Sequence, residues 1–272
     1  TRNYNVAGVF HYIGKANQVT GTGLPATAAN KHVIVELAND NLEFTSTNGI
    51  IRFNNPTTAI GSNFKGLEIR KGTVIADDTG NRFEDSATTG EVGNLKMTGG
   101  IYKIFTRDTQ PAVSGNYDLS TGSKIIFAHT SATTTTQAIR GGTDYQYPEI
   151  EVTGEDVYHS SGNINMKSNG LFTVKENAVL TSIGSNAQIV SLNDTNPATV
   201  TIENNGTFKT ERVKGFSGTP DGINPAPSVR TGHTTGNVLV TLQPGSIVEY
   251  SRAGDQTITH TNFSATSTPY SY

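Results

Sequence analysis

A short acidic stretch holds the residues of this chain whose types and spacing could do chemistry. Asp77, Asp78, Glu84 and Asp85 lie close together, with Arg82 among them. Enzymes that cleave polysaccharides need carboxylates that converge at about 5 to 9.5 Å, where they act as acid, base or nucleophile. Carboxylates that are only neighbours in sequence tend to point apart. We therefore predict a solvated turn whose Asp side chains accept local hydrogen bonds, and we predict no catalytic residues.

The pair Asp77 and Asp78 is also the candidate metal site. Calcium binds carboxylate and carbonyl oxygens, so a calcium ion at this corner is the one cofactor that we consider. The histidines lack the short, fixed spacing of a metal motif. They are His11, His32, His129, His159, His233 and His260. The chain has no cysteine, which excludes disulfides and thiol chemistry.

Three tyrosines form the candidate ligand-binding set. Tyr145, Tyr147 and Tyr158 lie near one another in sequence, and a protein that binds sugars uses aromatic rings as stacking platforms. The alternative is that these rings pack at strand edges while their hydroxyls stay in contact with water. Variable loops at 130–147 and 215–236 are the places where we expect a binding site for a glycan or a protein.

Charge and hydropathy exclude two classes of partner. The formal net charge is −3, and like charges do not cluster as they do on a nucleic-acid-binding face. The sequence also lacks an apolar run long enough to span a bilayer. We expect neither a nucleic-acid partner nor a membrane span.

An internal repeat organises the whole chain. The sequence Gly245–Tyr250, followed by Gln256, has diverged counterparts at Gly8–Tyr12 with Gln18 and at Gly122–Phe127 with Gln137. The glutamine spacings are 137 − 18 = 119 and 256 − 137 = 119 residues. Self-similarity at a fixed period is typical of repeat architectures. We predict one elongated segment over 1–272, with repeats at 3–121, 122–240 and a truncated 241–272. We also expect this segment to belong to a longer array, in which neighbouring repeats pack on one another.

Short alternating apolar runs predict β-strands throughout, with almost no helix. Like strands in the second half recur at similar distances: Ile164 to Ile189 is 189 − 164 = 25 residues, and Leu180 to Phe208 is 208 − 180 = 28. Stacked coils suit a polar chain of which only 34% is apolar. The sequence favours a right-handed parallel β-helix, a β-solenoid with roughly 25–30 residues per rung.

Turn formers between the strands keep a second architecture open. Asn48-Gly49 and Asn169-Gly170 are strong hairpin signals between alternating strands. Tandem antiparallel β-sandwiches would use such hairpins, whereas the same residues make corners in a parallel β-helix.

The Gln-centred blocks resemble the repeats of very large surface proteins of Bacteroidota. The resemblance rests on the Gly-turn, aromatic and Gln-Thr-Ile pattern ending at Gln256–Ile258 and on segments such as Thr199–Phe208. Many of these proteins look like type IX secretion cargo, and some are adhesins. The resemblance implies an extracellular, cell-surface location and a non-catalytic, rod-like stalk or adhesin repeat. A carbohydrate-active β-helix enzyme, a polysaccharide lyase or hydrolase, is the alternative function.

One modification site is implied by the same resemblance. Asp85-Ser86-Ala87 matches the short acceptor pattern for O-glycans known in that phylum. Ser86 is therefore the candidate O-glycosylation site.

Overall fold

The computed structural model describes the chain over 8–21, 24, 27–29, 32–43, 50–56, 64–77, 79–85, 91–130, 136–184, 187–219, 226–233 and 235–258. The chain divides into two compact units, unit 1 (Thr1–Ile126) and unit 2 (Phe127–Tyr272). Every regular element in the described part is a β-strand. This confirms the all-β prediction.

The strands of unit 1 are short except for β4 and β6, and the last of them, β13, crosses the sequence boundary into unit 2. Their bounds are β1 (Val9–Gly14), β2 (Gln18–Val19), β3 (Thr27–Ala29), β4 (His32–Glu43), β5 (Ile50–Pro56), β6 (Gly66–Ala76), β7 (Arg82–Asp85), β8 (Glu91–Val92), β9 (Asn94–Met97), β10 (Ile101–Ile104), β11 (Asp108–Gln110), β12 (Tyr117–Leu119) and β13 (Lys124–Phe127).

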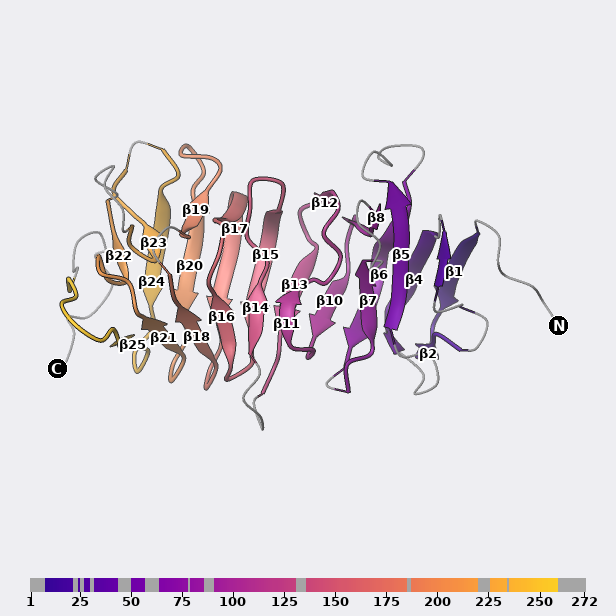
Figure 1. The fold of residues 1–272 in the computed structure, drawn as a ribbon, viewed down its shortest axis with the longest axis horizontal. Helices are drawn as coiled ribbons and strands as arrows, with labels where there is room; N and C mark the ends of the chain where they lie inside the picture. The colour runs from indigo at the N-terminus through magenta and orange to yellow at the C-terminus, as the bar shows by residue number, and fades with distance from the viewer. Residues whose placement is uncertain are drawn as a thin grey trace. The chain divides into compact units, whose positions relative to one another are not determined.

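In unit 1 the main sheet is parallel, and buried apolar residues stack from strand to strand across it. Strands β1, β4, β6, β9 and β12 pair in that order, and Figure 1 labels β1, β4, β6 and β12 among them. Val35, Ile69, Met97 and Leu119 are partners along these strands, and all four are buried. Strands β3, β5 and β7 form a second parallel set. The described antiparallel pair is β5 with β8.

Unit 2 contains the remaining strands. Their bounds are β14 (Gln137–Ile139), β15 (Gln146–Val152), β16 (Val157–His159), β17 (Ile164–Val174), β18 (Val179–Ser182), β19 (Ile189–Ser191), β20 (Ala198–Ile202), β21 (Thr207–Thr210), β22 (Ser217–Gly218), β23 (Val229–Arg230), β24 (Val238–Leu242) and β25 (Ile247–Tyr250).

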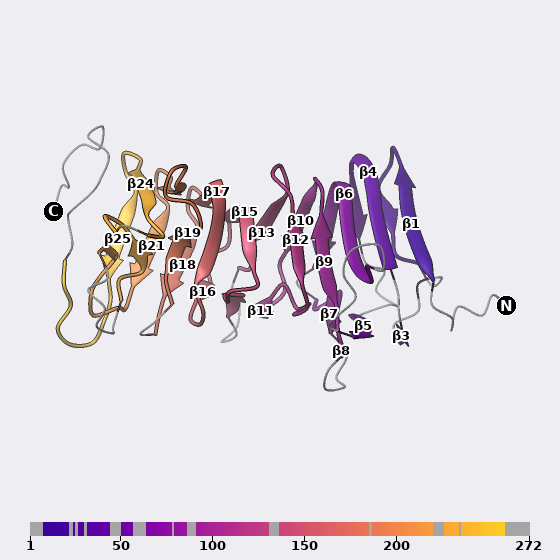
Figure 2. The same cartoon turned by 90° about the horizontal axis from the view of Figure 1, so that it is seen from above.

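Unit 2 also pairs its strands in parallel, in two sets that Figure 2 shows from above. Strands β15, β17, β20 and β24 form one set, and β14, β16, β18, β21 and β25 form the other. The long strand β17 pairs with β19 through its first half and with β20 through its second half. One buried row of side chains runs Ile150, Phe172, Val200, Val240.

These pairings bear directly on the two architectures that the sequence left open. Large parallel sheets agree with stacked coils, and they do not form the hairpin-linked ribbons that tandem antiparallel sandwiches require. Asn169 adopts a positive φ of 54° inside β17. It therefore bends a strand between two parallel partners instead of closing a hairpin.

The three repeated glutamines share a bonding role. Gln137 Oε1 accepts the backbone N–H of His129, and Gln256 Oε1 accepts that of Arg252. Both donors lie two residues after the aromatic that ends the preceding strand, Phe127 or Tyr250. Gln18 Nε2 donates to the Ile13 carbonyl, one residue after Tyr12. Gln137 and Gln256 thus bond to the loop that precedes them, whereas Gln18 bonds to the end of strand β1.

A fully buried histidine lies inside unit 2. His159 is the partner of Ser182 on the next strand, and its Nε2 lies 2.9 Å from the carbonyl oxygen of Gly162. A carbonyl only accepts, so Nε2 carries the proton and Nδ1 does not. Burial lowers the pKa of His159 to about 4, and the nearby charge of Arg212 acts in the same direction. The imidazole is therefore neutral at neutral pH.

Acid should destabilise unit 2 through this histidine. The folded pKa lies below the ordinary value of 6.5, so the contribution of neutral His159 is complete above about pH 6.5 and is lost as the pH falls toward 4. The loss amounts to as much as about 3 kcal/mol. We expect the melting temperature of wild type to fall more than that of His159→Gln between pH 7 and pH 4.5. Equal pH slopes for the two proteins would contradict this assignment, and His11→Gln, at an exposed position, serves as the control.

Candidate functional site

Three acidic residues of the predicted stretch are described, Asp77, Glu84 and Asp85, and each has partners of its own. Asp77 closes its own turn: its Oδ1 accepts the backbone N–H groups of Thr79 and Asn81, and its Oδ2 accepts Asn81 Nδ2. Glu84 pairs with Arg52 Nη2 at 2.7 Å and with Arg82 Nη2 at 2.6 Å. Asp77 thus accepts the local hydrogen bonds of a turn, whereas Glu84 lies in strand β7 and pairs with arginines.

Asp85 fastens two loops of unit 1. Its carboxylate accepts the backbone N–H groups of Gly93 and Ser114 and the Ser114 hydroxyl. Asp78 and Ser86 lie outside the described residues, so the calcium site and the O-glycosylation site stay predictions. Among the described residues, three or more His, Asp or Glu side chains nowhere gather in a way that could hold a metal ion.

The three candidate tyrosines occupy different environments. Tyr147 is fully buried, and its hydroxyl donates to the Arg140 carbonyl at 2.7 Å, so its ring offers no face to an external sugar. Tyr145 is half-buried, and the guanidinium carbon of Arg140 lies 5.7 Å from its ring centroid. Tyr158, on β16, is also half-buried, and burial together with the Asp156 carboxylate raises its pKa. The set does not form one aromatic platform.

A charged network on the outer face of unit 1 was not predicted from the sequence. Glu68, near the start of β6, is 5% exposed although it is an acid. Its Oε2 lies 2.8 Å from His32 Nε2, and its Oε1 accepts Arg70 Nε at 2.9 Å. Arg70 Nη1 also reaches Glu36 at 3.3 Å. Parallel register brings these charges together, because His32, Glu36 and Glu68 lie at neighbouring positions of β4 and β6.

The network keeps Glu68 ionised. Burial alone would raise its pKa, but the hydrogen bonds and charges of Arg70, with His32 and Lys96, hold the pKa of Glu68 below its ordinary value. Burial lowers the pKa of His32, so a neutral imidazole donates its Nε2 proton to the carboxylate. A carboxylate held ionised in this way suits a structural anchor more than a general acid.

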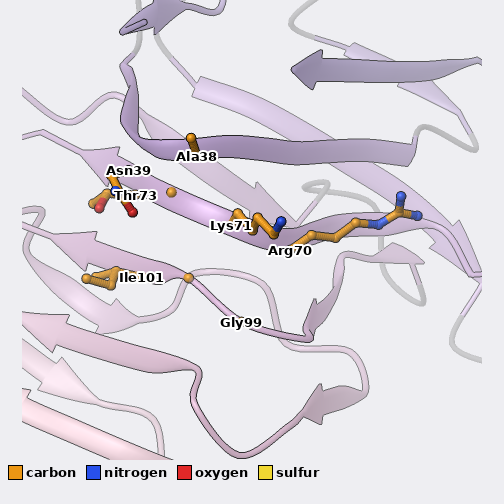
Figure 3. Close-up of a pocket in the computed structure, with 9 residues that line it drawn as sticks. Ala38, Asn39, Arg70, Lys71, Thr73, Gly99 and Ile101 are labelled. Atoms are coloured by element: carbon orange, nitrogen blue, oxygen red, sulfur yellow. The ribbon is translucent and has the colours of Figure 1, made fainter. Parts of the chain in front are cut away.

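A shallow groove of about 510 Å³ lies beside Arg70 (Figure 3). It forms where the β4–β6 register shifts: Glu36 pairs with Lys71 and Asn41 with Thr73, so four residues of β4, 37–40, lie opposite the single residue Gly72 of β6. Gly72 allows the close approach, with φ at +81°, since a Cβ there would collide with the Leu37 carbonyl. The groove is lined by Ala38, Asn39, Arg70, Lys71, Gly72, Thr73, Gly99, Gly100 and Ile101.

The groove lining suits hydrogen bonding to a polar ligand. Figure 3 shows the Arg70 side chain extended away from Asn39 and Thr73, which leaves Lys71 as the cation nearest the middle of the groove. Lys71 is exposed. The lining residues include an amide, an ammonium and a hydroxyl but no carboxylate. Such a set can bind oxygen-rich groups, and it lacks the acid pair of a glycosidase.

Comparisons with known proteins add no identification. No model of a known protein family matches the chain, and no curated protein and no solved structure matches it. In the described part of the chain, the structure has no helix long and apolar enough to cross a membrane.

Replacing Glu68 should destabilise unit 1. In Glu68→Gln, His32 and Arg70 lose a charged acceptor. A hydrogen bond to a charged group contributes about 1.5–3 kcal/mol to stability. We expect the free energy of unfolding at pH 7 to fall by about 1–3 kcal/mol in urea denaturation. The advantage of wild type should fade below about pH 4.5, because the folded pKa of Glu68 lies below that ordinary value.

Glu43→Gln is the matched control for that experiment, because Glu43 is exposed at the end of β4. A surface change of this kind shifts stability by no more than about 0.5 kcal/mol. Equal effects of the two substitutions would show that the Glu68 network does not stabilise the unit.

Proposed function

We propose that the chain is a non-catalytic structural or adhesive segment of a large secreted cell-surface protein. In this proposal its strands wind as a right-handed parallel β-helix of roughly 25–30 residues per rung, and the segment acts as a rod-like stalk or an adhesin repeat. The resemblance of the Gln-centred blocks to Bacteroidota surface proteins supports the extracellular location.

The observation that carries the proposal is the in-register stacking of buried apolar side chains. Val35, Ile69 and Met97 stack in unit 1, and Phe172, Val200 and Val240 stack in unit 2. Each strand buries its apolar side only against its neighbours, so added repeats extend the structure and add surface without enclosing a new core. A segment built this way holds surface loops at a distance or presents them.

The described carboxylates support a non-catalytic role. Asp77, Glu84 and Asp85 are engaged by turns, arginines and loops, and Glu68 is held ionised by cations. The groove around Lys71 offers a place for a glycan to bind without being cleaved. A polysaccharide lyase or hydrolase is the alternative that the following experiment distinguishes.

Incubation with a panel of neutral and acidic polysaccharides should give no cleavage products. Reducing ends and unsaturated uronates would be measured over time, and retention would be measured by affinity electrophoresis. An adhesive segment is retained by at least one polysaccharide without product release, and a stalk is retained by none. Catalytic release of products would contradict the proposal.

Variants of the groove locate the binding face if retention is observed. Lys71→Gln should weaken retention, because it removes the ammonium from the groove and leaves the backbone turn intact. Lys15→Gln is the control, since Lys15 is also exposed but does not line the groove. Equal weakening by both would indicate general charge attraction instead of a site.

A further inference from the structure

The most unusual group in unit 2 is a buried arginine. Arg212 is 1% exposed and is the largest side chain that unit 2 buries completely. Its Nε donates to Ser182 Oγ at 2.9 Å, and its Nη2 donates to the Ile183 carbonyl at 2.9 Å. Its backbone N–H donates to Thr210 Oγ1. Arg212, which follows strand β21, is therefore held by hydrogen bonds to residues at the end of strand β18.

The charge of this guanidinium is not balanced by an acid. No described Asp or Glu forms an ion pair with Arg212, and burial alone lowers its pKa, to about 10. Arg212 is thus a cation at neutral pH. Burying an ion without a counter-charge costs several kcal/mol even after the surroundings relax. Such a site is retained only where something compensates the charge.

One nitrogen of the guanidinium lacks a hydrogen-bond partner among the described residues. Nη1 of Arg212 is buried and has no hydrogen-bond partner among the described residues. The neighbouring polar groups supply no negative charge: His159 is neutral, and its Nδ1 carries only a lone pair. Thr210 Oγ1 is already engaged by the Gly215 carbonyl and by Ser228.

We propose that Arg212 Nη1 holds a monovalent halide ion inside unit 2. Ser182 Oγ occupies Nε and the Ile183 carbonyl occupies one N–H group of Nη2, so the two parallel N–H groups of Nε and Nη2 that commonly bind a carboxylate or phosphate are already engaged. A small single-atom anion suits the remaining donor, Nη1. A water molecule would satisfy the N–H group but would leave the charge unbalanced.

Crystals grown in sodium bromide test this site directly. We expect an anomalous bromine peak in hydrogen-bonding contact with Arg212 Nη1. A water molecule without anomalous signal at that place, or a packed interior with no solvent atom there, would overturn the proposal. This measurement uses wild-type protein, so it does not depend on whether a variant folds, and it does not depend on the proposed function.

Melting in solution provides the second test. At constant ionic strength, replacing gluconate by chloride should raise the melting temperature until the site saturates, because a ligand that binds only the folded state stabilises it. Arg212→Gln should remove the chloride dependence. Arg82→Gln should keep it, since Arg82 is a partly buried arginine that already has Glu84 as its counter-charge. A wild-type melting temperature that is the same in both salts contradicts the proposal.

Discussion

Parallel pairing in register is the constraint on which the rest of the structure depends. A strand such as β20 has backbone partners only on its two neighbours, β17 and β24. Because paired residues face the same side, an apolar position on one strand calls for an apolar position on the next. Phe172, Val200 and Val240 meet that requirement. A chain that is only 34% apolar can fold this way because each strand needs only a few inward side chains.

Polar side chains stabilise the loops between the strands by hydrogen-bonding to the loop backbone. Gln137 and Gln256 bond the backbone of the loop before them, and Asn94 accepts the Asn116 N–H while its amide donates to the Lys65 carbonyl. Buried polar groups are tolerated when such bonds satisfy them. Loop closure therefore gives the repeated glutamines Gln137 and Gln256 a structural role.

The strands and their parallel stacking could be predicted from the sequence, because alternation and near-regular spacing are local signals. The step from Leu180 to Phe208, inferred from spacing alone, is a true pairing of β18 with β21. The burial of Tyr147 could not be inferred, since the register shifts between Tyr147 and Glu149. Charged residues such as Glu68 and Arg212 suggest a solvated face in sequence, and only the pairing of distant strands reveals that they are buried.

The groove escaped prediction for the same physical reason. It depends on the four residues 37–40 of β4 that lie opposite the single residue Gly72 of β6, and on the close approach that Gly72 permits. Both follow from how β4 pairs with β6. Its one advance signal is the glycine after two cations, Arg70-Lys71-Gly72. The triplet alone does not predict a groove, because the groove depends on how β4 pairs with β6.

Disulfide crosslinking tests the in-register stacking most directly, because the natural chain has no cysteine to interfere. Thr173 and Thr201 are partners on β17 and β20, so Thr173→Cys with Thr201→Cys places the two Cα atoms within the range that a disulfide spans. The account predicts efficient crosslinking of that pair and little crosslinking of Thr173→Cys with Thr199→Cys, which is offset by two residues. Preferential crosslinking of the offset pair, or of neither pair in folded protein, would contradict it.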